Sequence, residues 1–222
     1  NEMPKNNFLK KIRKLADKTN SVLIFDECTS GFRVSLGGTY KKFNIAPDLI
    51  VYGKSLGNGY PINAVLGKKK IMQNEKNTFI SSTFWSDRVG PVAALATLRL
   101  MKRKNFFKTI VENGKYIKKK WRELAKKNKL KIKVYGLDTL PRYEIISKNW
   151  ELYRFFITQE FLKKHILATS LIYLSKLHTK KQINLYLKIV GEVFEKISDF
   201  EKNNSIPNLM GDKALPQFKR LN

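Results

Sequence analysis

Two apolar runs that each end in polar residues decide the fold of this chain. The first is Ser21-Val22-Leu23-Ile24-Phe25, which leads into Asp26, and the second is Pro47-Asp48-Leu49-Ile50-Val51-Tyr52, which leads into Gly53-Lys54. Continuous apolar runs of this length are typical of buried parallel strands. Polar groups just past the carboxyl ends of such strands are where open α/β sheets bind their ligands. The sequence therefore predicts an α/β fold with Asp26 and Lys54 at one edge of a sheet.

An amine and a carboxylate at the same sheet edge suit one cofactor chemistry in particular. A lysine amine forms a Schiff base with the aldehyde of pyridoxal 5'-phosphate (PLP), and a carboxylate pairs with the pyridine nitrogen. A protonated ring withdraws the electrons that remain on the substrate carbon when its proton departs. We therefore expect Lys54 and Asp26 to converge on one PLP ring.

Four motifs that occur in order make this prediction specific. They are Asp26-Glu27-Cys28-Thr29-Ser30-Gly31-Phe32-Arg33, Ala46-Pro47-Asp48-Leu49, Gly53-Lys54-Ser55-Leu56-Gly57-Asn58-Gly59-Tyr60-Pro61 and Ser82-Thr83-Phe84-Trp85. In these motifs the chain resembles the class III PLP-dependent aminotransferases. Within that family it is most similar to the branch that contains glutamate-1-semialdehyde 2,1-aminomutase. The similarity extends from about Phe8 to Met101, and more loosely to the end.

The resemblance implies roles for four residues. Lys54 would be the catalytic lysine that forms the Schiff base, and Asp26 would face the pyridine nitrogen. Cys28 would pack on the face of the ring, and Thr83 would donate to the cofactor phosphate across a dimer interface. The resemblance also implies a small amino-compound substrate and a homodimer with the site at the interface. The residues leave open whether the enzyme is a transaminase or an aminomutase.

Each of these residues also has a plainer interpretation. Lys54 could be one surface lysine among many, although the glycines that flank it after an apolar run favour a functional site. Asp26 could be a turn aspartate, and Thr83 could belong to a simple polar turn. Glu27 and Arg33 could either pair with each other or hold the loop between them.

The charge of the chain is strongly basic. It has 44 Lys and Arg residues against 18 Asp and Glu, a net charge of +26. Such an excess could attract nucleic acid or an anionic membrane surface. The lysines are spread in short clusters along the chain, so we expect a solvated surface and no specific nucleic-acid or membrane partner. The single cysteine and two histidines favour neither a disulfide nor a zinc site, and we expect a cytoplasmic protein.

The expected architecture is a fold-type I PLP-transferase with two parts. Residues 1–120 would be the C-terminal portion of a large PLP-binding domain with a mixed, mostly parallel sheet. Residues 121–202 would form a small α+β domain, and residues 203–222 an irregular tail. Because the resemblance covers only the latter part of the family's length, the alternative is a catalytically incomplete fragment that needs the missing N-terminal segment.

The apolar periodicity places the main elements. It predicts long helices over 87–103 and 106–127, where apolar residues recur at helical spacing. It predicts strands over 21–25, 48–52 and 62–67.

Overall fold

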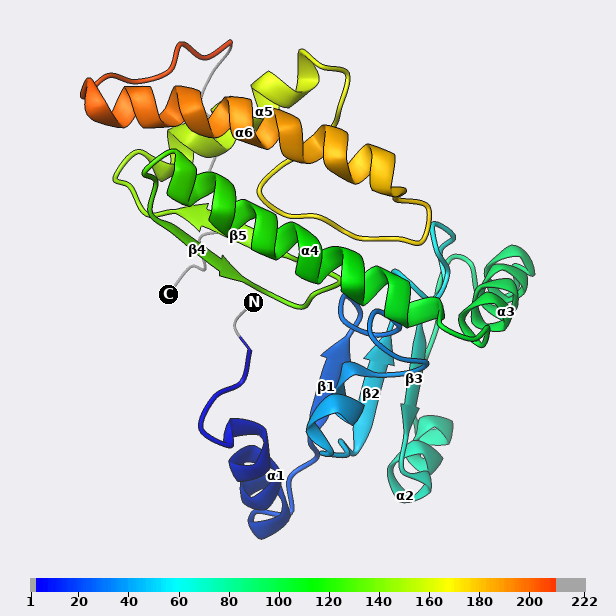
Figure 1. The fold of residues 1–222 in the computed structure, drawn as a ribbon. Helices are drawn as coiled ribbons and strands as arrows, with labels where there is room; N and C mark the ends of the chain where they lie inside the picture. The colour runs from blue at the N-terminus through cyan, green and yellow to red at the C-terminus, as the bar shows by residue number, and fades with distance from the viewer. Residues whose placement is uncertain (1–2, 211–222) are drawn as a thin grey trace. The chain divides into compact units, whose positions relative to one another are not determined.

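The structure is a computed structural model, and it describes residues 3–210. Within them the chain forms two compact units, one from Pro4 to Lys108 and the other from Thr109 onward. Figure 1 labels the helices and strands of both units. None of the helices in residues 3–210 is long and apolar enough to cross a membrane.

The first unit is a three-stranded sheet with helices around it. Its elements in chain order are α1 (Phe8–Lys18), β1 (Ile24–Glu27), η1 (Thr39–Phe43), β2 (Leu49–Tyr52), β3 (Ala64–Gly67), α2 (Lys69–Met72), η2 (Gln73–Asn77) and α3 (Val89–Met101). The helix predicted over 87–103 is therefore present as α3, shortened by two residues at each end.

The sheet is mixed, as predicted, but it is not mostly parallel. Its strand order is β1-β2-β3, with β1 and β2 parallel and β3 antiparallel to β2. In Figure 1 the arrow of β3 points opposite to the other two. The reason lies in residues 53–63, which join β2 to β3 without a helix. A parallel return needs a longer crossover, usually a helix, so the chain comes back antiparallel.

One face of the sheet carries the core of the unit. Ile50 and Tyr52 of β2 are buried together with Leu56 and with Ala94 of α3. Successive strand residues point to opposite faces. On the other face Ile24 keeps 54% of its surface exposed, so the prediction of a fully buried first strand is wrong. The described residues of this unit leave that face largely open.

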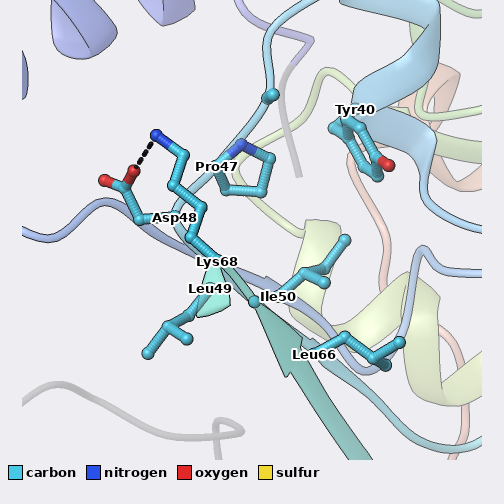
Figure 2. A pocket seen from close by; sticks show the side chains of 9 residues that line it. Tyr40, Pro47, Asp48, Leu49, Ile50, Leu66 and Lys68 are labelled. Atoms are coloured by element: carbon cyan, nitrogen blue, oxygen red, sulfur yellow. Dashed lines mark ion pairs between the residues drawn. The ribbon is translucent and has the colours of Figure 1, made fainter. Parts of the chain in front are cut away.

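A buried carboxylate fixes the end of the sheet where β2 begins. Asp48 accepts hydrogen bonds from the Arg13 guanidinium at 2.8 Å and from the Leu23 backbone N–H at 2.8 Å. It also forms an ion pair with Lys68 at 2.6 Å, which Figure 2 shows beside Pro47. The hydrogen bond from Lys68, followed by that from Leu23, holds the pKa of Asp48 well below its usual range. Asp48 therefore ties α1 and the end of β3 to the start of β2.

The second unit is an antiparallel hairpin with three helices. Its elements are α4 (Phe106–Lys127), β4 (Ile132–Tyr135), β5 (Arg142–Ile145), α5 (Trp150–Leu162) and α6 (Lys180–Lys202). Trp121 of α4 is fully buried and packs edge-on against Tyr143 of β5, with ring centroids 4.7 Å apart. Its indole N–H donates to the hydroxyl of Tyr186 on α6 at 3.2 Å. These contacts join the hairpin and two helices into one α+β core.

The two units divide at Lys108 and Thr109, earlier than the predicted boundary after residue 120. The reason is that α4 packs with the second unit along most of its length. A Cβ on Gly114 would lie only 1.5 Å from the carbonyl oxygen of Asp138, so only glycine fits where the helix meets this loop. In the predicted tail, residues 203–210 contain no helix or strand, and the remainder lies outside the described residues.

Candidate active site

Lys54 lies two residues beyond the carboxyl end of β2, and its side chain is exposed. The loop folds back on itself, because the Leu56 N–H donates to the Gly53 carbonyl at 2.7 Å and the Asn58 N–H donates to the Lys54 carbonyl at 2.9 Å. Lys54 has a φ of +22°, a conformation that residues with a side chain rarely adopt. Such backbone strain is concentrated at functional sites. This geometry fits the predicted importance of Lys54.

The amine of Lys54 has a definite partner on the neighbouring strand segment. Its Nζ donates to the Oγ1 of Thr29 at 2.5 Å. Thr29 comes two residues after the end of β1, which runs parallel to β2. Because the carboxyl ends of parallel strands meet at one edge, residues 25 positions apart come into contact here. The sequence motifs indicate no role for Thr29.

Asp26 lies inside β1 rather than after it, opposite Val51 of β2. The strand begins later than predicted, since the N–H and carbonyl of Leu23 are taken up by residues 48–49. The Asp26 side chain is exposed, and its Oδ1 accepts a hydrogen bond from the Cys28 N–H at 2.9 Å. Asp26 forms no ion pair with any residue of the described chain. Its carboxylate is therefore open to a cationic ligand atom.

Cys28 packs against the loop that carries Lys54. A Cβ on Gly53 would lie 2.7 Å from the Cys28 sulfur and 2.5 Å from the side-chain oxygen of Asn63. A side chain at position 53 would force Asn63 or Cys28 to shift, so the close approach of Cys28 favours glycine there. The cysteine is a free, half-buried thiol. Its place beside the lysine loop is consistent with a packing role.

Glu27 holds the segment after β1 in place. Its buried carboxylate accepts from the backbone N–H groups of Thr39 at 2.6 Å and Tyr40 at 2.7 Å, and from the Ser30 hydroxyl at 3.1 Å. Of the two roles considered for Glu27, the structure shows that it holds the loop. This network fixes the backbone next to Asp26.

Tyr52, at the end of β2, lies near the Glu27 carboxylate. Desolvation by burial, followed by the nearby Tyr40 and the Glu27 charge, raises the pKa of Tyr52 to about 12.

Thr83 does not join the other predicted residues. It lies in an exposed turn, and no hydrogen bond within residues 3–210 links it to Asp26 or Lys54. The same stretch exposes large apolar side chains, among them Phe79 at 95% and Trp85 at 69%. The structure thus brings Asp26, Cys28 and Lys54 to one edge of the sheet, and Thr83 has no hydrogen bond to any of them within the described residues.

The donor set at this edge fits PLP. Asp26 accepts from the Cys28 N–H and Lys54 donates to Thr29, and the two side chains do not pair directly with each other. A carboxylate for the ring nitrogen and an amine for the aldehyde are the two groups that PLP chemistry needs. No group of three or more metal-ligating side chains occurs in residues 3–210.

A separate pocket lies at the opposite end of β2. It has a volume of about 310 Å³, and Figure 2 shows it lined by Tyr40, Ile50 and Leu66 with the Asp48–Lys68 ion pair beside them. The pocket flanks the start of the strand, whereas Lys54 follows its end. It is therefore not part of the candidate site.

Comparisons with known proteins agree on one family. Residues 2–167 match the family described as "Aminotransferase class-III". A 3-aminobutyryl-CoA aminotransferase from Cloacimonas acidaminovorans (strain Evry) is 33% identical over 161 residues, 72% of this chain and 39% of the relative. A glutamate-1-semialdehyde 2,1-aminomutase from Wigglesworthia glossinidia brevipalpis is 30% identical over 212 residues, 87% of this chain and 48% of the relative.

The fold agrees as well. The solved structure of the PLP internal aldimine form of the FumI protein from Sphingopyxis sp. MTA144 superimposes with a TM-score of 0.81 at 25% identity. The match covers 90% of this chain and 48% of FumI. The chain thus spans about half the length of the proteins it matches. The resemblance deduced from the four motifs is confirmed.

Proposed function

We propose, because the chain belongs to the class III aminotransferases, that it takes part in PLP-dependent amino-group transfer. The substrate is a small amino compound, handled as in a transaminase or a 2,1-aminomutase, since relatives of both kinds match. One observation carries the proposal. The Asp26 carboxylate accepts from the Cys28 N–H and the Lys54 amine donates to the next residue, Thr29, at the carboxyl ends of two adjacent parallel strands.

Each residue at this edge has a task that its chemistry suits. Lys54 would hold the cofactor through its amine, and the same amine would move the proton at the amino-bearing carbon of the substrate. Asp26 would pair its carboxylate with the pyridine nitrogen, and Cys28 would contribute packing at the site. When bound, PLP supplies a sink for the electron pair that the broken bond leaves behind.

We also propose a homodimer in which Thr83 reaches the phosphate of the partner subunit's cofactor. Thr83 lies in an exposed turn, where a residue that serves a second copy must be accessible. Around it, Phe79, Trp85 and Val92 keep 95%, 69% and 63% of their surface exposed. Several large apolar side chains exposed in one stretch are typical of an interface.

The spectrum of bound PLP tests the function. After incubation with PLP and dialysis, the chain should retain a visible absorption band and a yellow colour. Lys54→Ala should remove the band, whereas Lys70→Ala, which alters another exposed lysine, should keep it. The same test is made with a longer product that includes any upstream coding sequence. If that product also stays colourless, the proposal fails.

A second candidate is that these 222 residues are catalytically incomplete by themselves. The observation behind it is that the chain spans 39% and 48% of the two curated relatives. The same spectrum separates the candidates when it is recorded for the chain alone and for a longer product that includes upstream coding sequence. A band in the longer product alone supports the second candidate, and equal bands contradict it.

A further inference from the structure

The hydroxyl of Thr29 is the only hydrogen-bond partner of the Lys54 amine in the described chain. We infer that Thr29 is a positioning residue for Lys54, which sets where the amine waits before it reacts. This inference rests on the proposed function for the task of Lys54. The contact itself, 2.5 Å between Nζ and Oγ1, does not depend on any cofactor.

Lys54 needs such a partner because its side chain is exposed and long. A lysine amine on a four-carbon stem samples many rotamers in water, and each of them moves the amine by several bond lengths. A single hydroxyl within hydrogen-bond distance selects one of those positions. The strained backbone at Lys54, with φ of +22°, sets the direction from which the stem starts.

Thr29 is itself held on both sides. Its carbonyl oxygen accepts a hydrogen bond from the Arg33 Nε at 3.0 Å. The next residue is fixed as well, because the Thr39 hydroxyl donates to the carbonyl of Ser30 at 2.7 Å. Threonine is branched at Cβ, so few rotamers of its side chain are open. A hydroxyl that is fixed in this way can define the position of a mobile amine.

Ser55, the other hydroxyl next to the lysine in sequence, does not share this role. Its Oγ is buried and has no hydrogen-bond partner within the described residues. Thr29, and not Ser55, bonds to the amine because of the sheet. Strands β1 and β2 are parallel and end at the same edge, so Thr29 and Lys54, which each follow one of these strands by two residues, lie close together. The amine is therefore positioned by the segment that directly follows the strand carrying Asp26.

Chemical labelling of Lys54 in the absence of PLP tests this role directly. The chain is treated with a limiting amount of acetic anhydride, and the acetylation rate of each lysine is measured by mass spectrometry. An amine held by a hydroxyl must leave it before it attacks the reagent. Thr29→Val should therefore raise the rate at Lys54 about 3- to 10-fold, the change that a hydrogen bond of ordinary net strength gives.

Two variants provide the controls. Thr29→Ser keeps the hydroxyl and should restore the slow rate of the wild type. Thr78→Val removes another exposed threonine hydroxyl of the same unit, one that donates to the Glu75 carbonyl at 2.8 Å, and should leave Lys54 unchanged. An unchanged rate at Lys54 in Thr29→Val, or a rate in Thr29→Ser as fast as in Thr29→Val, would overturn the inference.

Unfolding has its own signature in this experiment. If Thr29→Val raised the rate at all lysines, the pair Thr29→Ser and Thr29→Ala would decide, since only the first keeps the hydroxyl. Protection of Lys54 in the serine variant alone supports the inference, and equal labelling in both variants overturns it. The labelling result and the proposed function can fail separately. If Thr29→Val changes the labelling of Lys54 but the wild type shows no PLP-dependent band, the positioning role stands and the proposal of PLP as cofactor fails.

Discussion

The charged side chains at the two ends of strand β2 differ in burial and in pairing. At its start, the Asp48 carboxylate is buried and bonded to Arg13, Lys68 and the Leu23 backbone. At its end, the Asp26 and Lys54 side chains are exposed and are not paired with each other. A charge that is already neutralised contributes to stability, whereas one left open can bind a ligand. The sheet thus separates the charge that supports the fold from the charges available for chemistry.

Asp26→Asn should give the largest effect on activity. The amide keeps an oxygen for the Cys28 N–H but loses the negative charge. We expect kcat to fall about 10²- to 10³-fold, the usual cost of removing one electrostatic partner from a reacting group. The free energy of unfolding should change by less than about 0.5 kcal/mol, as for other exposed sites. Steady-state kinetics and urea denaturation measure the two quantities.

Asp48→Asn should show the reverse pattern at the other end of the strand. Loss of the buried negative charge weakens its bonds with Arg13 and Lys68, at a cost of about 1.5 to 3 kcal/mol in the free energy of unfolding, the usual contribution of a hydrogen bond to a charged group. Urea denaturation, compared with Asp26→Asn as the matched change of Asp to Asn, measures this loss. Equal stability of the two variants would contradict the contrast between the two ends.

Trp85→Ser should act on assembly rather than on either end of β2. Trp85 keeps 69% of its surface exposed, so the isolated subunit loses little packing. Truncation of a large aromatic residue at the centre of an interface costs about 2 kcal/mol, which weakens a dimer more than tenfold. Analytical ultracentrifugation over a dilution series measures the shift. A wild type that is monomeric at every concentration would contradict the proposed homodimer.

Acid should weaken the Asp48 end in a definite direction. The pKa of Asp48 is lowered from an ordinary value of 3.8 by Lys68 and Leu23, so its contribution to stability is complete above about pH 4. That contribution is lost as the pH falls from 3.8 toward the lower pKa of the folded state. Thermal melting from pH 5 to pH 2 should therefore decline more steeply in the wild type than in Asp48→Asn. Parallel curves would contradict the role of this carboxylate.

Sequence patterns located the long helices because their signals are local. The helix predicted over 106–127 has those bounds in the structure. The first strand was misplaced because its start depends on Asp48, a residue 25 positions from Leu23, whose side chain binds the Leu23 backbone. The antiparallel third strand could have been predicted from the short, helix-free connection before it.

The site was predictable only in part, for a similar reason. The four motifs led to Asp26, Cys28 and Lys54, which the fold brings to one edge of the sheet. Thr29 was passed over because a threonine after a strand is an ordinary turn residue, and only the pairing of two strands reveals its contact with Lys54. The roles of Thr83 and of a second subunit stay predictions.

The measurement that tests the central claim most directly is reductive trapping of PLP followed by peptide mapping. The chain contains 35 lysines, so an unspecific reaction with the aldehyde would label many of them. After incubation with PLP and reduction with borohydride, we predict that the phosphopyridoxyl group is recovered on the peptide that contains Lys54. Label spread over the surface lysines, with no excess at Lys54, would contradict the account.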